Sequence, residues 1–150
     1  MRFEDLTIGQ NAEFGKTISS EDVVLFAKIT GDFNPVHLDE AAAAKSQFKG
    51  RVAHGILTAG LISATLAGKL PGPGSIYLSQ TLRFTAPVRI GDTVTARVEI
   101  MELIVPKRRV RLSTVCRNQK GDTVVDGEAV VLVPKTAEQE IGEAAGSRGE

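Results

Sequence analysis

An alternation of apolar and polar side chains runs through the second half of the chain. In residues 93–100 the apolar positions are Val94, Ala96, Val98 and Ile100. The same period of two continues through residues 107–117 and 123–133, and residues 76–85 show it ahead of a turn at Pro87 and Gly91-Asp92. This period is typical of strands with one buried face. The pattern predicts a series of long antiparallel strands, to which residues 11–18 add an edge strand.

Helical patterns occupy the first half of the chain. Ser20 is followed by two acidic residues, which favours a helix that begins there and ends at Gly31. A second, short helix is predicted from Asp39 to about Phe48. The stretch GILTAGLISATLAGKL, residues 55–70, has no polar face, and a helix that is apolar all round is a buried helix. Its small residues allow neighbouring backbone to approach closely.

Consecutive antiparallel strands after one buried helix imply a sheet that curves around that helix. This is an α+β layer arrangement, in which one face of the sheet covers the helix and the polar face meets water or a second subunit. Residues 1–133 form a single domain in this interpretation. Residues 134–150 have little apolar content, so we expect them to be a disordered tail.

The overall composition narrows the class of protein. The 150 residues carry 18 basic and 18 acidic side chains, so no global field favours a nucleic acid or a membrane surface. The apolar run from 55 to 67 is too short to cross a bilayer, and the N-terminus lacks the apolar core of a signal peptide. A single cysteine, Cys116, excludes an internal disulfide. With only His37 and His54 beside it we expect no metal site, and we expect a cytoplasmic protein.

The stretch GDFNPVHLDE, residues 31–40, is the first candidate for chemistry. Pro35 fixes its own φ and pushes Asn34 toward extended geometry, which lets the loop curve so that Asp32 and His37 converge, with Asn34 bracing the turn. A carboxylate beside an imidazole can hold and polarise a water molecule. The same residues also suit a purely structural turn, in which Asp32 and Asn34 cap and His37 packs.

A second candidate is Ala53-His54-Gly55, at the start of the buried helix. The first amides of a helix have no partner within it, and Gly55 has no side chain to block approach. A carbonyl oxygen that gains negative charge could bind there; a plain helix start is the alternative. Ser63 lies further along the same helix and most simply bonds back to it. We expect Cys116 to be a core residue and the run Lys107–Arg111 to be a solvated strand start, with phosphate binding as the weaker alternative.

Three stretches together resemble the MaoC-like family of hot-dog-fold dehydratases, and among these the (R)-specific enoyl-CoA hydratases. They are TGDFNPVHLDEAAAAKSQF, VAHGILTAGLISA and PGPGSIYLSQTLRFTAPVRIGDTVTARVEI. The resemblance spans about residues 5–133, and its most specific element is the motif G-D-x-N-P-x-H. It implies a hot-dog fold, in which an antiparallel sheet wraps a long central helix, and pairing into homodimers or higher homo-oligomers.

The resemblance also implies an activity and its residues. The activity is reversible hydration of trans-2-enoyl-CoA to (R)-3-hydroxyacyl-CoA. Asp32 and His37 match the catalytic pair, Gly55 the glycine whose N–H binds the thioester carbonyl, and Asn34 and Ser63 supporting positions. Coenzyme A belongs to the substrate, so no metal or separate cofactor is expected. The alternatives are an acyl-CoA thioesterase of the same fold and a non-catalytic acyl-CoA-binding module.

Overall fold

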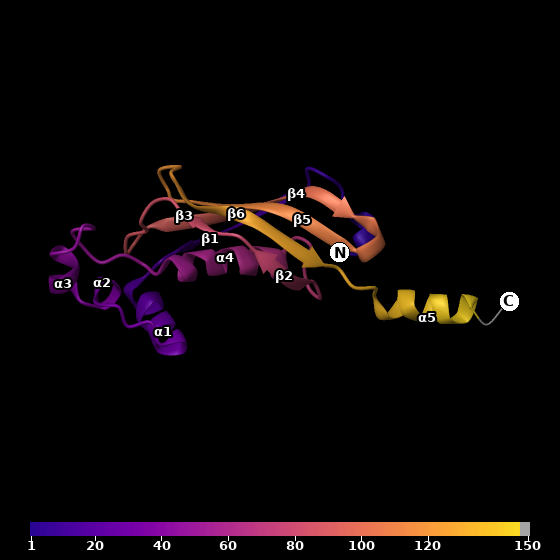
Figure 1. The fold of residues 1–150 in the computed structure, drawn as a ribbon, viewed down its shortest axis with the longest axis horizontal. Helices are drawn as coiled ribbons and strands as arrows, with labels where there is room; N and C mark the ends of the chain where they lie inside the picture. Colours follow the sequence, from indigo (N-terminus) through magenta and orange to yellow (C-terminus); the bar gives the residue numbers. More distant parts are fainter. Residues whose placement is uncertain (148–150) are drawn as a thin grey trace.

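A curved antiparallel sheet lies over one long helix (Figure 1). The computed structural model describes residues 1–147 of the chain. The sheet runs in the order β1-β4-β5-β6-β2, with β3 paired to β6. Its strands are β1 (Asn11–Thr17), β2 (Ile76–Gln80), β3 (Arg83–Phe84), β4 (Thr93–Ile104), β5 (Arg109–Arg117) and β6 (Thr123–Leu132). The predicted α+β arrangement of a sheet wrapped around a helix is confirmed.

The core forms where the sheet meets helix α4 (Gly55–Gly68). The inward positions of β4 are fully buried, as their alternation predicted: Val94, Ala96, Val98 and Ile100. From the helix, Leu61, Ile62 and Leu66 pack against them. Because each strand contributes every second side chain to this layer, a few long strands suffice to cover one face of the helix.

The prediction that α4 is buried all round is wrong for a single chain. One face packs on the sheet, while Ile56, Gly60, Ser63, Ala64 and Ala67 are exposed along the other. These positions recur every three or four residues and therefore form one stripe along the helix. The sheet of the same chain therefore leaves uncovered a stripe of mostly small residues, with Ile56 as its one large apolar side chain.

Residues 76–85 do not form the one continuous strand that their alternation predicted. The pairing of β2 with β6 shifts register between Tyr77 and Ser79, which is a bulge that breaks the period of two. The chain then separates β2 from β3. A Cβ atom on Gly127 of β6 would lie 1.8 Å from the carbonyl oxygen of Thr81, so the absence of a side chain at Gly127 lets the crossing backbone come this close.

Three short helices precede α4: α1 (Ser20–Thr30), α2 (Pro35–Leu38) and α3 (Glu40–Ala44). Ser19, rather than Ser20, caps α1, in a capping box with Asp22. Gly31 ends α1 in the left-handed region, with φ of 85°, as predicted. Helix α3 begins after Asp39 as expected but is shorter than predicted.

The early end of α3 has a local cause. The hydroxyl of Ser46 donates to the carbonyl oxygen of Ala43 at 2.6 Å and accepts from the amide of Phe48 at 3.1 Å. A serine side chain that satisfies backbone groups in this way competes with continuation of the helix.

The predicted disordered tail is incorrect for most of its length. Residues Ala137–Gly146 form helix α5, which extends away from the sheet in Figure 1. Thr136 and Gln139 form a capping box, and the alanines and glutamates between them and Gly146 have good helix propensity. None of its side chains is buried. The low apolar content therefore correctly indicated that this segment makes no core contacts, but it did not indicate that the segment is helical. Residues 148–150 of that prediction lie outside the described part of the chain.

Across residues 1–147 the structure contains no helix that is both long and apolar enough to cross a membrane.

Candidate active site

A pocket of about 550 Å³ opens where the N-terminus of α4 meets the loop after α1. Its walls come from residues 32–37, Phe48, residues 52–58, residues 84–88 and the start of β6 at 124–125. Its volume is that of a small-molecule site. Asp32, Asn34, His37 and Gly55, which the sequence singled out from two separate stretches, all line it.

The loop that carries Asp32 is shaped by its own side chains. Asp32 follows the left-handed Gly31, and its Oδ1 accepts from the amide of Asn34 at 3.3 Å. The side chain of Asn34 in turn accepts from the amide of Val36 at 3.3 Å and caps α2. Asn34 therefore braces the turn, as predicted.

Pro35 acts differently from what the sequence suggested. It does not keep the chain out of a helix but begins one, as the first residue of α2. Proline is tolerated there because the first helical amide has no acceptor in any case, and its fixed φ already suits the helix. The single turn of α2 then places His37 at the pocket.

The ring of His37 is held in one orientation. Its Nδ1 lies 2.7 Å from the carbonyl oxygen of Val52, and since a carbonyl can only accept, Nδ1 carries the hydrogen. In the neutral ring this leaves the lone pair on Nε2. The backbone of His37 is fixed as well, because Arg51 donates from Nε to its carbonyl oxygen at 2.7 Å and from Nη1 to Ser20 at 3.0 Å.

His54 is the residue for which sequence reasoning found no role. Its side chain is only 2% exposed, and its Nε2 lies 3.0 Å from the backbone carbonyl oxygen of Asp32. Its ring centroid is 3.9 Å from that of His37 and 4.8 Å from that of Phe26. Burial lowers the pKa of His54, so the ring is neutral near pH 7. A histidine between Ala53 and the first residue of an apolar helix could have indicated burial, but nothing local points to its partners.

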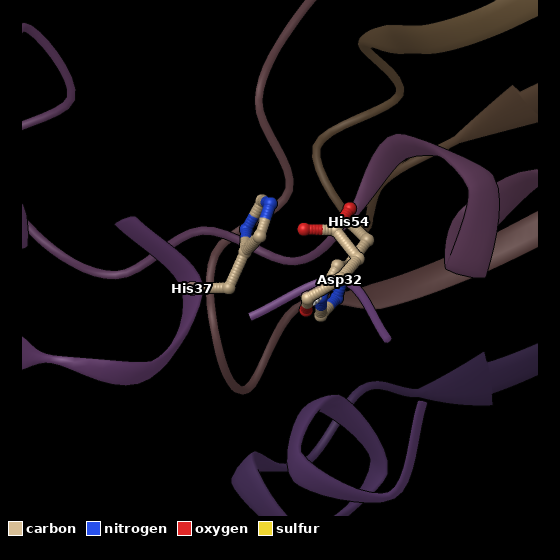
Figure 2. A group of neighbouring side chains, drawn as sticks. All are labelled: Asp32, His37 and His54. Atoms are coloured by element: carbon tan, nitrogen blue, oxygen red, sulfur yellow. Dashed lines mark hydrogen bonds between the residues drawn. The ribbon is translucent and has the colours of Figure 1, made fainter. Parts of the chain in front are cut away.

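Figure 2 shows Asp32, His37 and His54 gathered at one place, and one ligand atom from each lies within 4.8 Å of the others. The structure thus brings together the two residues that the motif paired and adds a third. Two imidazoles and a carboxylate can hold a metal ion or a polarised water. Each ring already uses one nitrogen on a backbone carbonyl. Nε2 of His37 remains for either purpose, whereas Nδ1 of His54 is buried.

Gly55 is the first residue of the 14-residue helix α4, so its amide has no helical acceptor and sits at the positive end of the helix dipole. The ring of Phe84, from β3, lies directly against it. A Cβ atom on Gly55 would be 2.6 Å from two carbons of that ring. Phe84 is 53% exposed, and the sequence analysis did not mark it.

The other candidates lie elsewhere. Ser63 is on the exposed stripe of α4 and does not line the pocket. Cys116 is fully buried, and burial raises the pKa of its thiol to about 12, so it is a core residue as predicted. Two members of the basic run Lys107–Arg111 are paired with acids: Arg108 with Glu4 at 2.6 Å, and Arg111 with Glu102 at 3.0 Å.

The family model described as MaoC like domain matches residues 4–125. Over 137 residues the chain is 58% identical to the 3-hydroxybutyryl-CoA dehydratase of Methylorubrum extorquens, covering 91% of this chain and 86% of that protein. It is 52% identical over 132 residues to the (R)-specific enoyl-CoA hydratase of Rhodospirillum rubrum, covering 88% of this chain and 91% of that protein.

A solved structure agrees with these sequence relatives. The unliganded R-hydratase PhaJ1 from Pseudomonas aeruginosa superimposes with a TM-score of 0.85 at 52% identity, covering 90% of this chain and 86% of that one.

Proposed function

This chain belongs to the family of MaoC-like domains, and from that membership we propose that it is an (R)-specific enoyl-CoA hydratase. It adds water reversibly to trans-2-enoyl-CoA and yields (R)-3-hydroxyacyl-CoA. The names of its two relatives describe the same chemistry in opposite directions, hydration and dehydration. The observation that carries the proposal is the single pocket in which a carboxylate, an imidazole and a free helix N-terminus meet.

The acid–base work falls to Asp32 and His37. In the hydration direction the water oxygen bonds to C3, one water proton is removed and C2 gains a proton. The pair accepts one proton and returns one, so it is unchanged after each turnover. His37 is prepared for this role because Nδ1–H is committed to Val52, which leaves Nε2 free to accept from water. Such groups typically contribute 10²–10⁴ in rate.

The thioester oxygen gains negative charge as the bond to C3 forms, because the intermediate is enolate-like. We assign the stabilisation of that charge to the amide of Gly55 and the dipole of α4, because Gly55 is the first residue of the helix. Only the N-terminal, positive end of α4 lines the pocket, because the C-terminal end lies at the far end of this long helix. The substrate therefore meets the end of the dipole that stabilises negative charge.

The chemistry requires no redox step and no Lewis acid, so we expect coenzyme A, as part of the substrate, to be the only non-protein group. Ser63 remains a predicted supporting residue. Its place on the exposed stripe of α4 suits a role beside a second subunit rather than in the pocket of its own chain. A cytoplasmic location also stays a prediction.

One assay separates hydration from the alternatives. Incubated with crotonyl-CoA, the protein should remove the enoyl absorbance without releasing free thiol, and the rate should not fall in EDTA. Release of thiol would instead indicate a thioesterase, because hydrolysis frees coenzyme A. Saturable binding without any turnover would indicate a binding module, and a loss of activity in EDTA would contradict the expectation that no metal is needed.

We further propose that the active unit is a homodimer formed along β2 and the exposed stripe of α4. The two edges of the sheet differ. The β1 edge carries Glu13 and Lys16, charges of the kind that discourage pairing. The β2 edge exposes Ile76, Tyr77 and Leu78 at 47%, 40% and 42%. An apolar sheet edge and an uncovered helix face on the same chain suit a self-complementary two-fold contact.

Sedimentation equilibrium tests this arrangement. The wild-type protein should sediment with the mass of two chains, and Leu78→Lys should shift it toward the mass of one, because a charge then lies in the contact. Asn11→Lys, on the β1 edge, is the matched control and should leave the dimer intact. A wild-type protein that sediments as a single chain at micromolar concentration would refute the proposal.

A further inference from the structure

We propose that His54 is a positioning residue that holds both Asp32 and His37 in place for catalysis; this rests on the proposed function of the same pocket. His54 is one of the few buried polar side chains of the chain. It contacts the backbone of one member of the pair and the ring of the other.

The first contact anchors the loop of Asp32. Residues 31–34 are exposed, and the hydrogen bonds that Asp32 and Asn34 make to neighbouring residues 30–37 are local, several of them at 3.3 Å. Within the described chain, the bond from Nε2 of His54 to the carbonyl oxygen of Asp32, at 3.0 Å, is the one hydrogen bond that ties residues 32–34 to a distant part of the fold. Without it, the loop depends on its own turn alone.

The second contact fixes the ring of His37. Its Nδ1 is bound to Val52, but a single hydrogen bond still allows the imidazole to tilt about that axis. The ring of His54 lies against it, with centroids 3.9 Å apart and planes inclined at 31°. Phe26 packs on the imidazole of His54 in turn, with centroids 4.8 Å apart. The aromatic contact thus limits the tilt and keeps Nε2 of His37 turned to the pocket.

The protonation of His54 follows from its partner. A carbonyl oxygen only accepts, so Nε2 carries the hydrogen, and burial lowers the pKa of the ring and keeps it neutral. A neutral ring holds the pair without adding a charge beside it. Its Nδ1 has no hydrogen-bond partner among the described residues, so the buried ring is retained at some energetic cost.

His54 also connects the two halves of the site. It is the N-cap residue of α4, directly before Gly55, whose amide we assign to the thioester oxygen. Because His54 and Gly55 are adjacent, the contacts of His54 with Asp32 and His37 also set the distance between the acid–base pair and the oxyanion donor. Misplacement of reacting groups by about 1 Å can cost about 10² in rate, which is the scale of effect that a lost anchor should have.

The decisive comparison uses two substitutions at His54 and one beside it. His54→Phe keeps a flat ring but removes the donor, and should lower kcat for crotonyl-CoA about 10- to 100-fold with KM within about threefold. His54→Gln keeps an amide donor near the position of Nε2 but loses the ring that lies against His37, so it should recover part of that loss. Phe26→Leu loosens the packing on His54 but keeps its hydrogen bond to Asp32 and its contact with His37, and should lower kcat by less than His54→Phe does.

Two results would overturn the proposal. One is a loss in His54→Phe no larger than that in Phe26→Leu, and the other is an equal loss in His54→Phe and His54→Gln, because then the hydrogen bond does not matter. Should the variants fail to fold, two-bond ¹H–¹⁵N spectra of the wild-type protein decide. Nε2 of His54 must carry a hydrogen at pH 7, and a neutral Nδ1–H tautomer, which has no donor at Nε2, contradicts the anchor. The spectra do not depend on turnover, so they separate a failure of this proposal from a failure of the hydratase assignment.

Discussion

Asp32→Asn and His37→Gln should each lower kcat for hydration of crotonyl-CoA by about 10²–10⁴, the usual value of a positioned acid or base. Both side chains line the pocket, and neither replacement can accept a proton from water near neutral pH. The measurement is the initial rate of loss of enoyl absorbance at saturating substrate.

Stability should change far less than turnover. The carboxylate of Asp32 is exposed and accepts from Asn34 at 3.3 Å, so Asp32→Asn removes little from the folded state. His37→Gln gives up the bond to Val52, which costs on the order of 1 kcal/mol. Asp122→Asn, an exposed carboxylate in the turn before β6, is the matched control and should keep both its turnover and its melting temperature.

The double variant tests whether the two residues act as a unit. Groups that share one proton transfer are strongly non-additive, so the double variant should be no worse than the poorer single variant by more than a few-fold. Two single variants that each keep more than about a tenth of wild-type turnover would show that the acid–base assignment is wrong.

The elements that the sequence predicted correctly are those whose signals are local. The alternation in β4 reports which side of the strand faces the core, and Gly31 marks a stop because its left-handed φ of 85° suits glycine. The bulge in residues 76–85 and the break between β2 and β3 were missed because they depend on how these residues align with β6. Such a register depends on two segments that are far apart in the sequence.

The site divides in the same way. Asp32, Asn34 and His37 lie within one motif, and resemblance to a family linked them to Gly55. The role of His54 was not predicted because its partners are a backbone carbonyl 22 residues away and a ring 17 residues away. The sequence around His54 does not indicate either contact. The exposed stripe of α4 was missed for a different reason: the sequence shows that a helix face lacks polar residues, but not whether the rest of the chain covers that face.

Gly55→Ala should lower kcat/KM for crotonyl-CoA by about 10²–10³, the usual loss when one oxyanion donor is removed. The methyl group would lie 2.6 Å from two carbons of the Phe84 ring, so the ring must move. Since Phe84 is 53% exposed, it can turn aside, but methyl and ring together then occupy the space through which the thioester oxygen reaches the amide.

The fold itself should tolerate the change. Alanine is a better helix former than glycine by about 1 kcal/mol, and Gly55 has no left-handed φ that a side chain would strain. We therefore expect the melting temperature of Gly55→Ala to stay close to the wild-type value while activity falls. Gly68→Ala is the control within α4: a Cβ there meets nothing within 4 Å, so it should leave activity unchanged.

Gly55→Ala combined with Phe84→Leu separates the effect of the new methyl group from that of the displaced Phe84 ring. Leucine is smaller than the phenyl ring and flexible, so it relieves the collision with the new methyl group without restoring free access to the amide. If blocked access to the amide causes the loss, the double variant stays impaired, whereas recovery to near wild-type kcat/KM would trace the loss to the displaced ring. A Gly55→Ala protein that keeps more than about a third of wild-type kcat/KM would contradict the role of this amide.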